Sequence, residues 1–115
     1  VNAPVVAGKR LAKLMGVQAI VDDMRMAPSN ARALIAQGIR EIAGKKGPPL
    51  PLFMAKLSAT ESAVRVVDRC LALHGAAGYS RALPVERRVR DVRAFTIHWG
   101  NNEVLRDTIR KASLS

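Results

Sequence analysis

At 115 residues the chain is one domain or part of one, long enough to bury roughly two-thirds of its unfolded surface. Aliphatic residues are plentiful and only four residues are aromatic, which favours packed helices over β-strands. The net charge of +10 suits an acidic partner subunit or a polyanionic ligand such as a coenzyme; the basic residues show neither zinc-finger spacing nor interleaved aromatic residues, which argues against nucleic acid.

We expect neither a membrane span nor a secretion signal. No run of about eighteen apolar residues occurs, and residues 1–10 lack a long apolar region after a basic start. The single cysteine, Cys70, excludes an internal disulfide and fits a reducing cytoplasm. Because Cys70 falls in a helical pattern, it is better explained as a small core residue than as a nucleophile.

Residues 8–43 are predicted to form one long helix. Their apolar residues repeat every seven positions in two rows, Leu14, Val21, Pro28, Ile35 and Ile42, and Val17, Met24, Ala31 and Gly38. Pro28 disfavours a straight helix, and Ser29 or Asn30 could cap a new start, so two helices meeting near residues 27–28 are the alternative. Because the apolar phase passes through Pro28 without a slip, we predict a single helix kinked there.

A Gly- and Pro-rich loop at residues 44–49 precedes a second predicted helix over 51–75. Its apolar stripe is Phe53, Leu57, Thr60, Val64, Val67, Leu71 and His74. Gly75 is expected to end the helix because glycine adopts positive φ at little cost. His74, at the end of the stripe, is expected to be a packing or hydrogen-bonding residue.

After a connector at 76–82, a short helix over about 84–91 and a last helix over about 101–112 complete the prediction. Pro84 opens the former, and Asn101 or Asn102 caps the latter, with Glu103 in its first turn. The fold class is therefore all-α, a single helical domain over 1–115 built as an up-and-down bundle. Since three full helices rarely cover two long seams, we expect a missing fourth helix or a partner chain.

Residues 54–109 resemble the C-terminal helical domain of acyl-CoA dehydrogenases. The residues that carry the resemblance keep the family's order without gaps: Ala55-Lys56, Leu73-His74-Gly75, Gly78-Tyr79, Pro84-Val85-Glu86-Arg87, Arg90-Asp91, Arg93, Gly100, Glu103 and Arg106. Upstream, residues 8–18 and Asp23-Met24 are similar to a glycine- and glutamine-containing segment of the same family. The block at residues 84–93, PVERRVRDVR, is the most specific part.

The resemblance implies an FAD flavoprotein that carries out α,β-dehydrogenation of acyl-CoA thioesters. It implies a helical N-terminal domain, a middle β domain and this bundle, with FAD bound between domains and against a neighbouring subunit. The chain has no counterpart of the first two domains or of the first bundle helix. We therefore expect a fragment or a truncated chain, assembled as a homo- or hetero-oligomer with subunits of the same family.

The family's usual catalytic base, the Glu of a Tyr-Glu-Gly-Thr turn, is replaced by Trp99. Trp has no basic lone pair, so no catalytic residue is assigned in this chain. His98, at the family's Tyr position, is better explained by packing or hydrogen bonding than as a base. Some members place the base on the bundle helix that this chain lacks, which leaves an active enzyme open.

Several flavin contacts implied by the family are replaced by apolar residues, namely Pro4, Ala7, Met15, Ala72 and Ala76. Each lost charge-assisted bond is worth roughly 1.5–3 kcal/mol, so the flavin site is expected to be weak or absent. Gly75, Gly100, Asn101 and Glu103 remain as cofactor-binding candidates from the resemblance. Glu86, Arg87, Arg90, Asp91 and Arg93 are expected to form a charge network between the short helix and the bundle. No metal site is expected, because the two histidines and the cysteine lie far apart.

Three functions are thus left. The first is a degenerate subunit that completes an oligomer and one wall of a partner's acyl-CoA site. The second is part of an active dehydrogenase whose base lies upstream. The third is a stand-alone helical interaction module.

Overall fold

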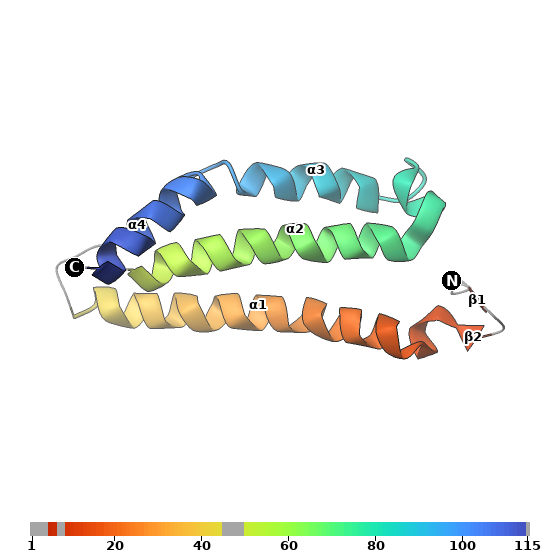
Figure 1. Ribbon diagram of the computed structural model, residues 1–115, viewed down its shortest axis with the longest axis horizontal. Coiled ribbons are helices and arrows are strands. Elements are labelled where there is room, and N and C mark those ends of the chain that lie inside the picture. The colour runs from red at the N-terminus through yellow and green to blue at the C-terminus, as the bar shows by residue number, and fades with distance from the viewer. Residues whose placement is uncertain (1–4, 7–8, 45–49, 115) are drawn as a thin grey trace.

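The computed structural model describes residues 5–6, 9–44 and 50–114, which form the predicted all-α fold (Figure 1). Its four helices are α1 (Met15–Ile42), α2 (Leu50–Tyr79), α3 (Val85–Phe95) and α4 (Asn102–Leu114). Two short strands, β1 (Val5–Val6) and β2 (Lys9–Arg10), pair antiparallel before a 3₁₀ turn at Leu11–Lys13.

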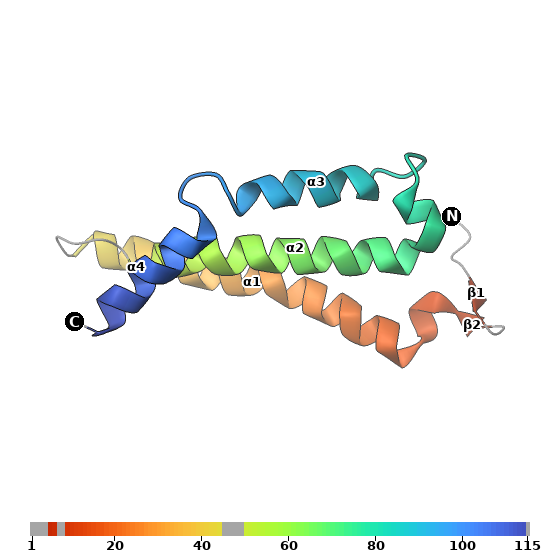
Figure 2. The same cartoon turned by 45° about the horizontal axis from the view of Figure 1, so that its top comes forward.

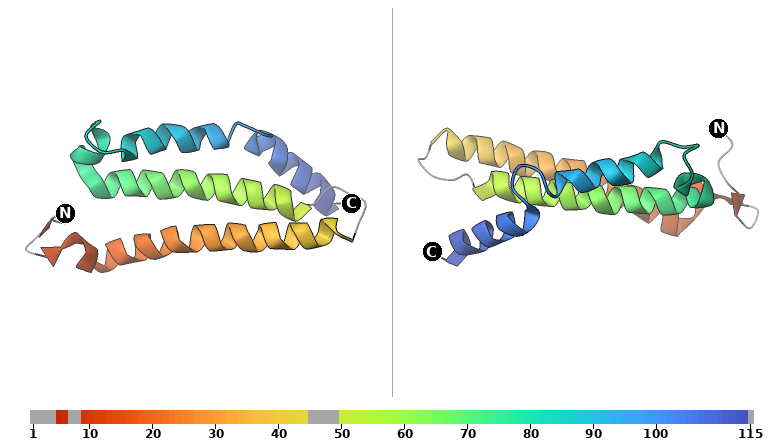
Figure 3. Two further views of the ribbon diagram at one scale, coloured as in Figure 1. Left: turned by 180° about the vertical axis from the view of Figure 1, so that it is seen from behind. Right: turned by 90° about the horizontal axis from the view of Figure 1, so that it is seen from above.

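The helices form an elongated layer. The helix α2 lies between α1 on one side and α3 on the other, and α4 turns out of that layer (Figures 2 and 3). The molecule measures 58 × 25 × 23 Å with a radius of gyration of 17.8 Å, against about 13 Å for a compact domain of this length. Its accessible surface is 8698 Å², whereas about 6,100 Å² is typical of a monomer of this mass. The layer therefore leaves surface exposed that a compact fold would bury.

The first helix is shorter than the predicted range of 8–43. It begins at Met15 because Leu14 is extended (φ −78°, ψ 128°), and Gln18 Nε2 turns back to donate to the Ala12 carbonyl at 3.3 Å. Residues 9–13, predicted as helix, instead form β2 and the 3₁₀ turn, and Gly8 lies outside the described residues. From Met15 onward α1 continues through Pro28 as one element, so the alternative of two separate helices is wrong.

The second helix does break at Gly75, which has φ 58° and ψ −145°. A further helical turn follows up to Tyr79, so the predicted connector at 76–82 is shorter than expected. Gly78 lets this turn pack, because a Cβ there would lie 2.6 Å from His74 Cβ and 3.4 Å from Val85 Cγ1. The third helix also extends to Phe95 rather than ending near residue 91.

The predicted seam of α1 is covered on one row only. Ala31 and Gly38 of the inner row are buried, and Gly38 meets Leu52 of α2 so closely that a Cβ would lie 2.5 Å from Leu52 Cδ2. The outer row stays open, with Ile35 43% and Ile42 49% exposed.

The stripe of α2 is half-buried from Phe53 to Leu71 and exposed at His74. Among the described residues no large side chain is fully buried, and the hydrophobic core consists of Ala31, Ala55, Val85 and Leu105. The two seams are thus incompletely covered within the described part of the chain, as expected because three full helices rarely cover two long seams.

Candidate functional site

The turn between α3 and α4 carries Trp99, the residue that the resemblance aligns with the family's base. It starts with helix-like bonds in which the Ile97 and His98 amides both donate to the Ala94 carbonyl at 3.0 Å. It is closed by the Asn102 amide, which donates to the Thr96 carbonyl at 3.0 Å. Between these bonds Trp99 has φ 55° and Gly100 φ 89°, two successive left-handed residues. Trp99 is 95% exposed, so the turn projects its indole into solvent.

Lys56, in the second turn of α2, is bound to this turn. Its Nζ donates to the Gly100 carbonyl at 2.7 Å and to Asn102 Oδ1 at 2.8 Å. Asn102 is buried, and its Nδ2 donates to Thr60 Oγ1 at 3.0 Å. Desolvation lowers the pKa of Lys56 below its ordinary value of 10.5. The sequence indicated Lys56 only as part of a family motif and gave no sign of this contact, which joins residues 44 and 46 positions apart.

Asn101 caps α4, which decides between the two predicted caps. Its Oδ1 accepts a hydrogen bond from the Glu103 amide at 3.0 Å, and its carbonyl accepts one from the Leu105 amide at 3.0 Å. Asn102 is the first helical residue, and its side chain serves Lys56 and Thr60 instead.

A groove of about 460 Å³ lies beside the start of α4. Charged and amide side chains line it, contributed by Glu61, Arg65, Arg93, Asn101, Asn102 and Glu103. Glu61 also forms an ion pair with Arg106 of α4. Because both signs of charge face it, the groove suits a polar ligand better than a simple anion.

Each histidine is held at one ring nitrogen by the backbone of its own helix or turn. His98 Nδ1 lies 2.9 Å from the Ala94 carbonyl, and His74 Nδ1 lies 2.7 Å from the Cys70 carbonyl. A ring nitrogen facing a carbonyl must carry the proton, so in the neutral ring of each histidine the basic lone pair is on Nε2. The half-buried thiol of Cys70 lies 3.8 Å from the same His74 Nδ1. Across the described ranges no group of three or more His, Cys, Asp and Glu side chains could hold a metal ion.

The cofactor candidates from the resemblance fall into two separate places. Gly100, Asn101 and Glu103 are neighbours at the start of α4. Gly75 lies at the other end of α2, about 28 Å along the helix axis from Lys56 by the helical rise of 1.5 Å per residue. No side chain or backbone atom of another segment lies within 4 Å of a Cβ placed on Gly75. One copy of the described chain therefore does not bring the four residues into a single enclosed site.

The ion pairs of the predicted charge network run along α3 instead of joining it to the bundle. Glu86 pairs with Arg90, and Asp91 lies 3.7 Å from Arg87 Nε and 3.8 Å from Arg88 Nη1. Pairs of this spacing on one exposed helix contribute only about 0.3–0.5 kcal/mol each. The network thus stabilises α3 locally.

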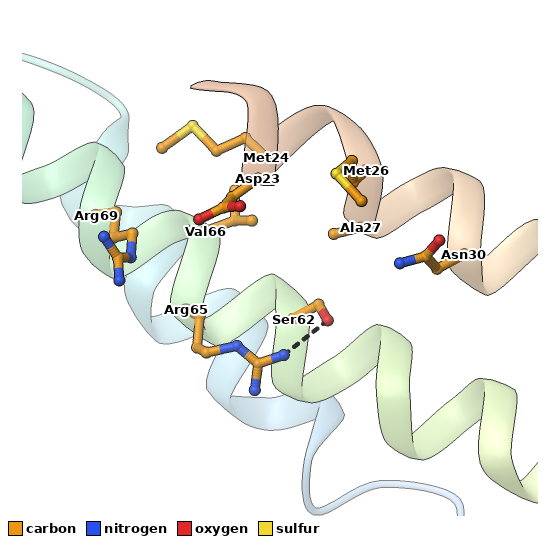
Figure 4. Close-up of a pocket in the computed structure, with 9 residues that line it drawn as sticks. All are labelled: Asp23, Met24, Met26, Ala27, Asn30, Ser62, Arg65, Val66 and Arg69. Atoms are coloured by element: carbon orange, nitrogen blue, oxygen red, sulfur yellow. Dashed lines mark hydrogen bonds between the residues drawn. The ribbon is translucent and has the colours of Figure 1, made fainter. Parts of the chain in front are cut away.

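Further grooves lie on both sides of the contact between α1 and α2. One, of about 300 Å³, is lined on its polar side by Asp23, Asn30, Arg65 and Arg69, and Figure 4 shows Arg65 turned back along α2 to Ser62. The other side is apolar, with about 240 Å³ over Ala27, Ala31 and Ala63 and about 340 Å³ over Val66, Val67 and Val85. None of the cofactor candidates lines these grooves.

None of the helices in the described ranges combines the length and the apolar character that crossing a membrane requires.

Comparison with known proteins gives a consistent result. The pattern of the family described as "Acyl-CoA dehydrogenase, C-terminal domain" matches residues 1–114. The 3-sulfinopropanoyl-CoA desulfinase of Paraburkholderia xenovorans is 36% identical over 103 residues, which are 89% of this chain and 26% of that protein. Three further bacterial relatives of the same name are 34–35% identical.

The mitochondrial short-chain specific acyl-CoA dehydrogenase of Sus scrofa is 35% identical over 100 residues, which are 86% of this chain and 24% of that protein. Butyryl-CoA dehydrogenase from Megasphaera elsdenii superimposes with a TM-score of 0.86 at 30% identity. That match covers 97% of this chain and 29% of the other. The chain thus spans about a quarter of the length of these relatives.

Proposed function

We propose that this chain, which belongs to the acyl-CoA dehydrogenase family as its C-terminal helical domain, forms part of a subunit that has no catalytic base of its own. Its role is to complete an oligomer of acyl-CoA dehydrogenase-like subunits and one wall of a partner's acyl-CoA site. The observation that carries the proposal is Trp99, which the resemblance aligns with the family's base and which lies exposed on the turn between α3 and α4.

Removal of the α-proton of an acyl thioester requires a titratable group within hydrogen-bond reach. The indole of Trp99 only donates, through its single N–H. His98 is the nearest imidazole in sequence, and the Ala94 carbonyl holds its Nδ1. Trp99 therefore supports binding or assembly and not proton abstraction at position 99.

Members of the family are FAD flavoproteins. The residues of this chain fit such a group only in part. Gly75 and Gly100 offer open backbone, and Asn101 and Glu103 border a polar groove. Because Gly75 lies about 28 Å along α2 from Lys56, which binds the turn that holds the other three, we infer that one FAD would be shared with a second polypeptide. This separation supports an assembly in which this chain supplies a partial flavin wall.

The open surface supports the same assembly. The exposed row of α1 and the apolar grooves along α1 and α2 are surface that a partner subunit or a further helix would cover. A single cysteine without a disulfide is compatible with the cytoplasmic location expected from the sequence.

The first test is a visible absorption spectrum of the protein purified with its natural flanking sequence and any co-expressed neighbour. We expect a flavin spectrum only when a related subunit copurifies, and bleaching by acyl-CoA only in that complex. A flavin that is bleached by acyl-CoA in the absence of any other subunit would overturn the proposal in favour of an active dehydrogenase with its base elsewhere. A colourless folded monomer would support the stand-alone interaction module.

A second test places a carboxylate at position 99. Trp99→Glu should produce no measurable dehydrogenase activity, because flavin contacts are absent as well as the base. Trp99→Gln is the matched control, since glutamine has the shape of glutamate but an amide in place of the basic carboxylate. Robust turnover of an acyl-CoA by Trp99→Glu and not by Trp99→Gln would contradict the proposal.

The relatives named 3-sulfinopropanoyl-CoA desulfinase favour a second candidate, an enzyme that acts on a CoA thioester by a reaction other than dehydrogenation. A position 99 without a base is compatible with that reading. The test is sulfite release from 3-sulfinopropanoyl-CoA by the protein with its natural flanking sequence. Release above a boiled control would support this candidate, and none would exclude it.

A further inference from the structure

The turn at residues 96–102 is bound by a side chain of α2, which lies 44 positions before Gly100 in the sequence. We propose that Lys56 is the positioning residue that fixes the backbone at Trp99 and so sets the direction in which the side chain at position 99 projects. The importance of position 99 rests on the proposed function, while the contact itself rests on the geometry of Lys56, Gly100 and Asn102.

The backbone at this position needs outside support. A non-glycine residue in the left-handed region is unfavourable and persists only where its surroundings over-determine it. Trp99 is 95% exposed, so contacts of its own side chain do not provide that support. The constraint has to act on the backbone that flanks Trp99.

The hydrogen bonds within the turn do not reach Trp99. The Ile97 and His98 amides bind back to Ala94, and the Asn102 amide binds to Thr96. Among the described residues, the hydrogen bond from Lys56 Nζ to the Gly100 carbonyl, at 2.7 Å, is the one that reaches residues 99 and 100. Lys56 therefore constrains the segment that the local bonds leave free.

The second acceptor makes this constraint directional. Lys56 Nζ also binds Asn102 Oδ1 at 2.8 Å, and the Nδ2 of the same buried amide donates to Thr60 Oγ1 at 3.0 Å. The two acceptors, from Gly100 and Asn102, fix the position of the Lys56 ammonium group. The backbone of Lys56 is itself held in the helix α2. A charge-assisted pair of this kind is stronger than a neutral hydrogen bond. Motion of the turn relative to α2 must break both bonds together.

The test compares Lys56→Met with two matched variants in the full chain. Thr60→Val removes a hydroxyl that contacts Asn102 but not Gly100. Lys13→Met makes the same chemical change as Lys56→Met at an exposed site in the 3₁₀ turn before α1. Amide hydrogen exchange reports the turn, and time-resolved anisotropy reports Trp99, which is the only tryptophan. Far-ultraviolet circular dichroism confirms that each variant is folded.

In Lys56→Met the Asn102 amide should exchange about tenfold faster, as expected for loss of a charge-assisted bond. The fast component of Trp99 depolarisation should grow about twofold because the turn then moves on the nanosecond scale. Exchange in α1 should not change. Thr60→Val and Lys13→Met should leave both signals within about twofold of the wild type.

The proposal is refuted if folded Lys56→Met leaves both the exchange rate of the Asn102 amide and the depolarisation of Trp99 unchanged. It is also refuted if Thr60→Val changes both as much as Lys56→Met does. If Lys56→Met does not fold, Lys56→Gln and Lys56→Arg are compared instead. Gln is too short to reach both acceptors and should loosen the turn, whereas Arg keeps the charge and should not; the reverse order would refute the proposal. Both signals are independent of flavin and acyl-CoA, so failure here is distinguishable from failure of the proposed function.

Discussion

Replacing Gly38 with alanine tests the closest contact between α1 and α2. A Cβ at this position would lie 2.5 Å from Leu52 Cδ2, 2.6 Å from Cγ and 3.2 Å from the backbone nitrogen. Carbon atoms pack best at about 3.5–4.0 Å, so the two helices or the Leu52 side chain would have to give way by about 1 Å. Overpacking of this kind costs about 1–3 kcal/mol.

The same substitution also has a favourable term. Alanine is about 0.8–1.0 kcal/mol better than glycine inside a helix. The net effect of Gly38→Ala on the free energy of unfolding is therefore a loss of about 1 kcal/mol, obtained by setting the mid-range overpacking cost against this gain. Gly16→Ala, where no atom of another segment lies within 4 Å of the new Cβ, has only the favourable term and should stabilise the chain.

The reasoning is tested with Leu52→Ala as a background. That change removes both side-chain atoms that the new Cβ would meet and leaves only the backbone nitrogen at 3.2 Å. Gly38→Ala should then stabilise the chain by about 0.5–1 kcal/mol, so the sign of its effect inverts. Urea unfolding followed by far-ultraviolet circular dichroism measures the original chain, the three single variants and the double variant. If Gly38→Ala stabilises the original chain as much as Gly16→Ala does, the close approach of Gly38 to Leu52 is refuted.

Further substitutions address single features of the other helices. Pro28→Ala should stabilise α1 by about 1–3 kcal/mol, because Pro28 is exposed in mid-helix and lacks an amide donor; a loss in urea unfolding would mean that the ring itself is needed. Asn101→Ala should cost about 1 kcal/mol and speed exchange of the Glu103 amide, whose acceptor it removes; unchanged exchange would exclude Asn101 as the cap. Hydrogen bonds from Lys111 and Arg110 lower the pKa of Asp107 below its ordinary value of 3.8. The unfolded chain therefore takes up this proton first, and stability is lost as the pH falls below that value. Asp107→Asn should remove this part of the acid transition seen by circular dichroism. An unaltered transition would show that Asp107 does not contribute to the loss of stability at low pH.

The apolar periodicity predicted both long helices because burial of one face dominates their formation. The phase through Pro28 favoured one helix, and α1 is one helix. Gly75 was expected to take positive φ, and it does. Both predictions depend on residues close in sequence, for which helix geometry alone fixes the relations between side chains.

The boundaries were less predictable because contacts outside the helix decide them. Leu14 belongs to the apolar row, yet it is extended, and the helix begins only at Met15. The turn after Gly75 remains helical because Gly78 allows close packing against Val85. Neither effect leaves a signal in the local periodicity.

The fold class and the order of the helices could be predicted from the sequence, whereas the alignment of Trp99 with the family's base remains a prediction from the resemblance. These follow from periodicity and from matching motifs, which are properties of the chain read in order. The tertiary structure alone decided that Lys56 binds the turn at Gly100, that Gly75 lies far from Gly100, and that Ile35 and Ile42 of α1 stay exposed. These relations join residues tens of positions apart, and they are set by how α2 packs between its neighbours, which no local pattern encodes.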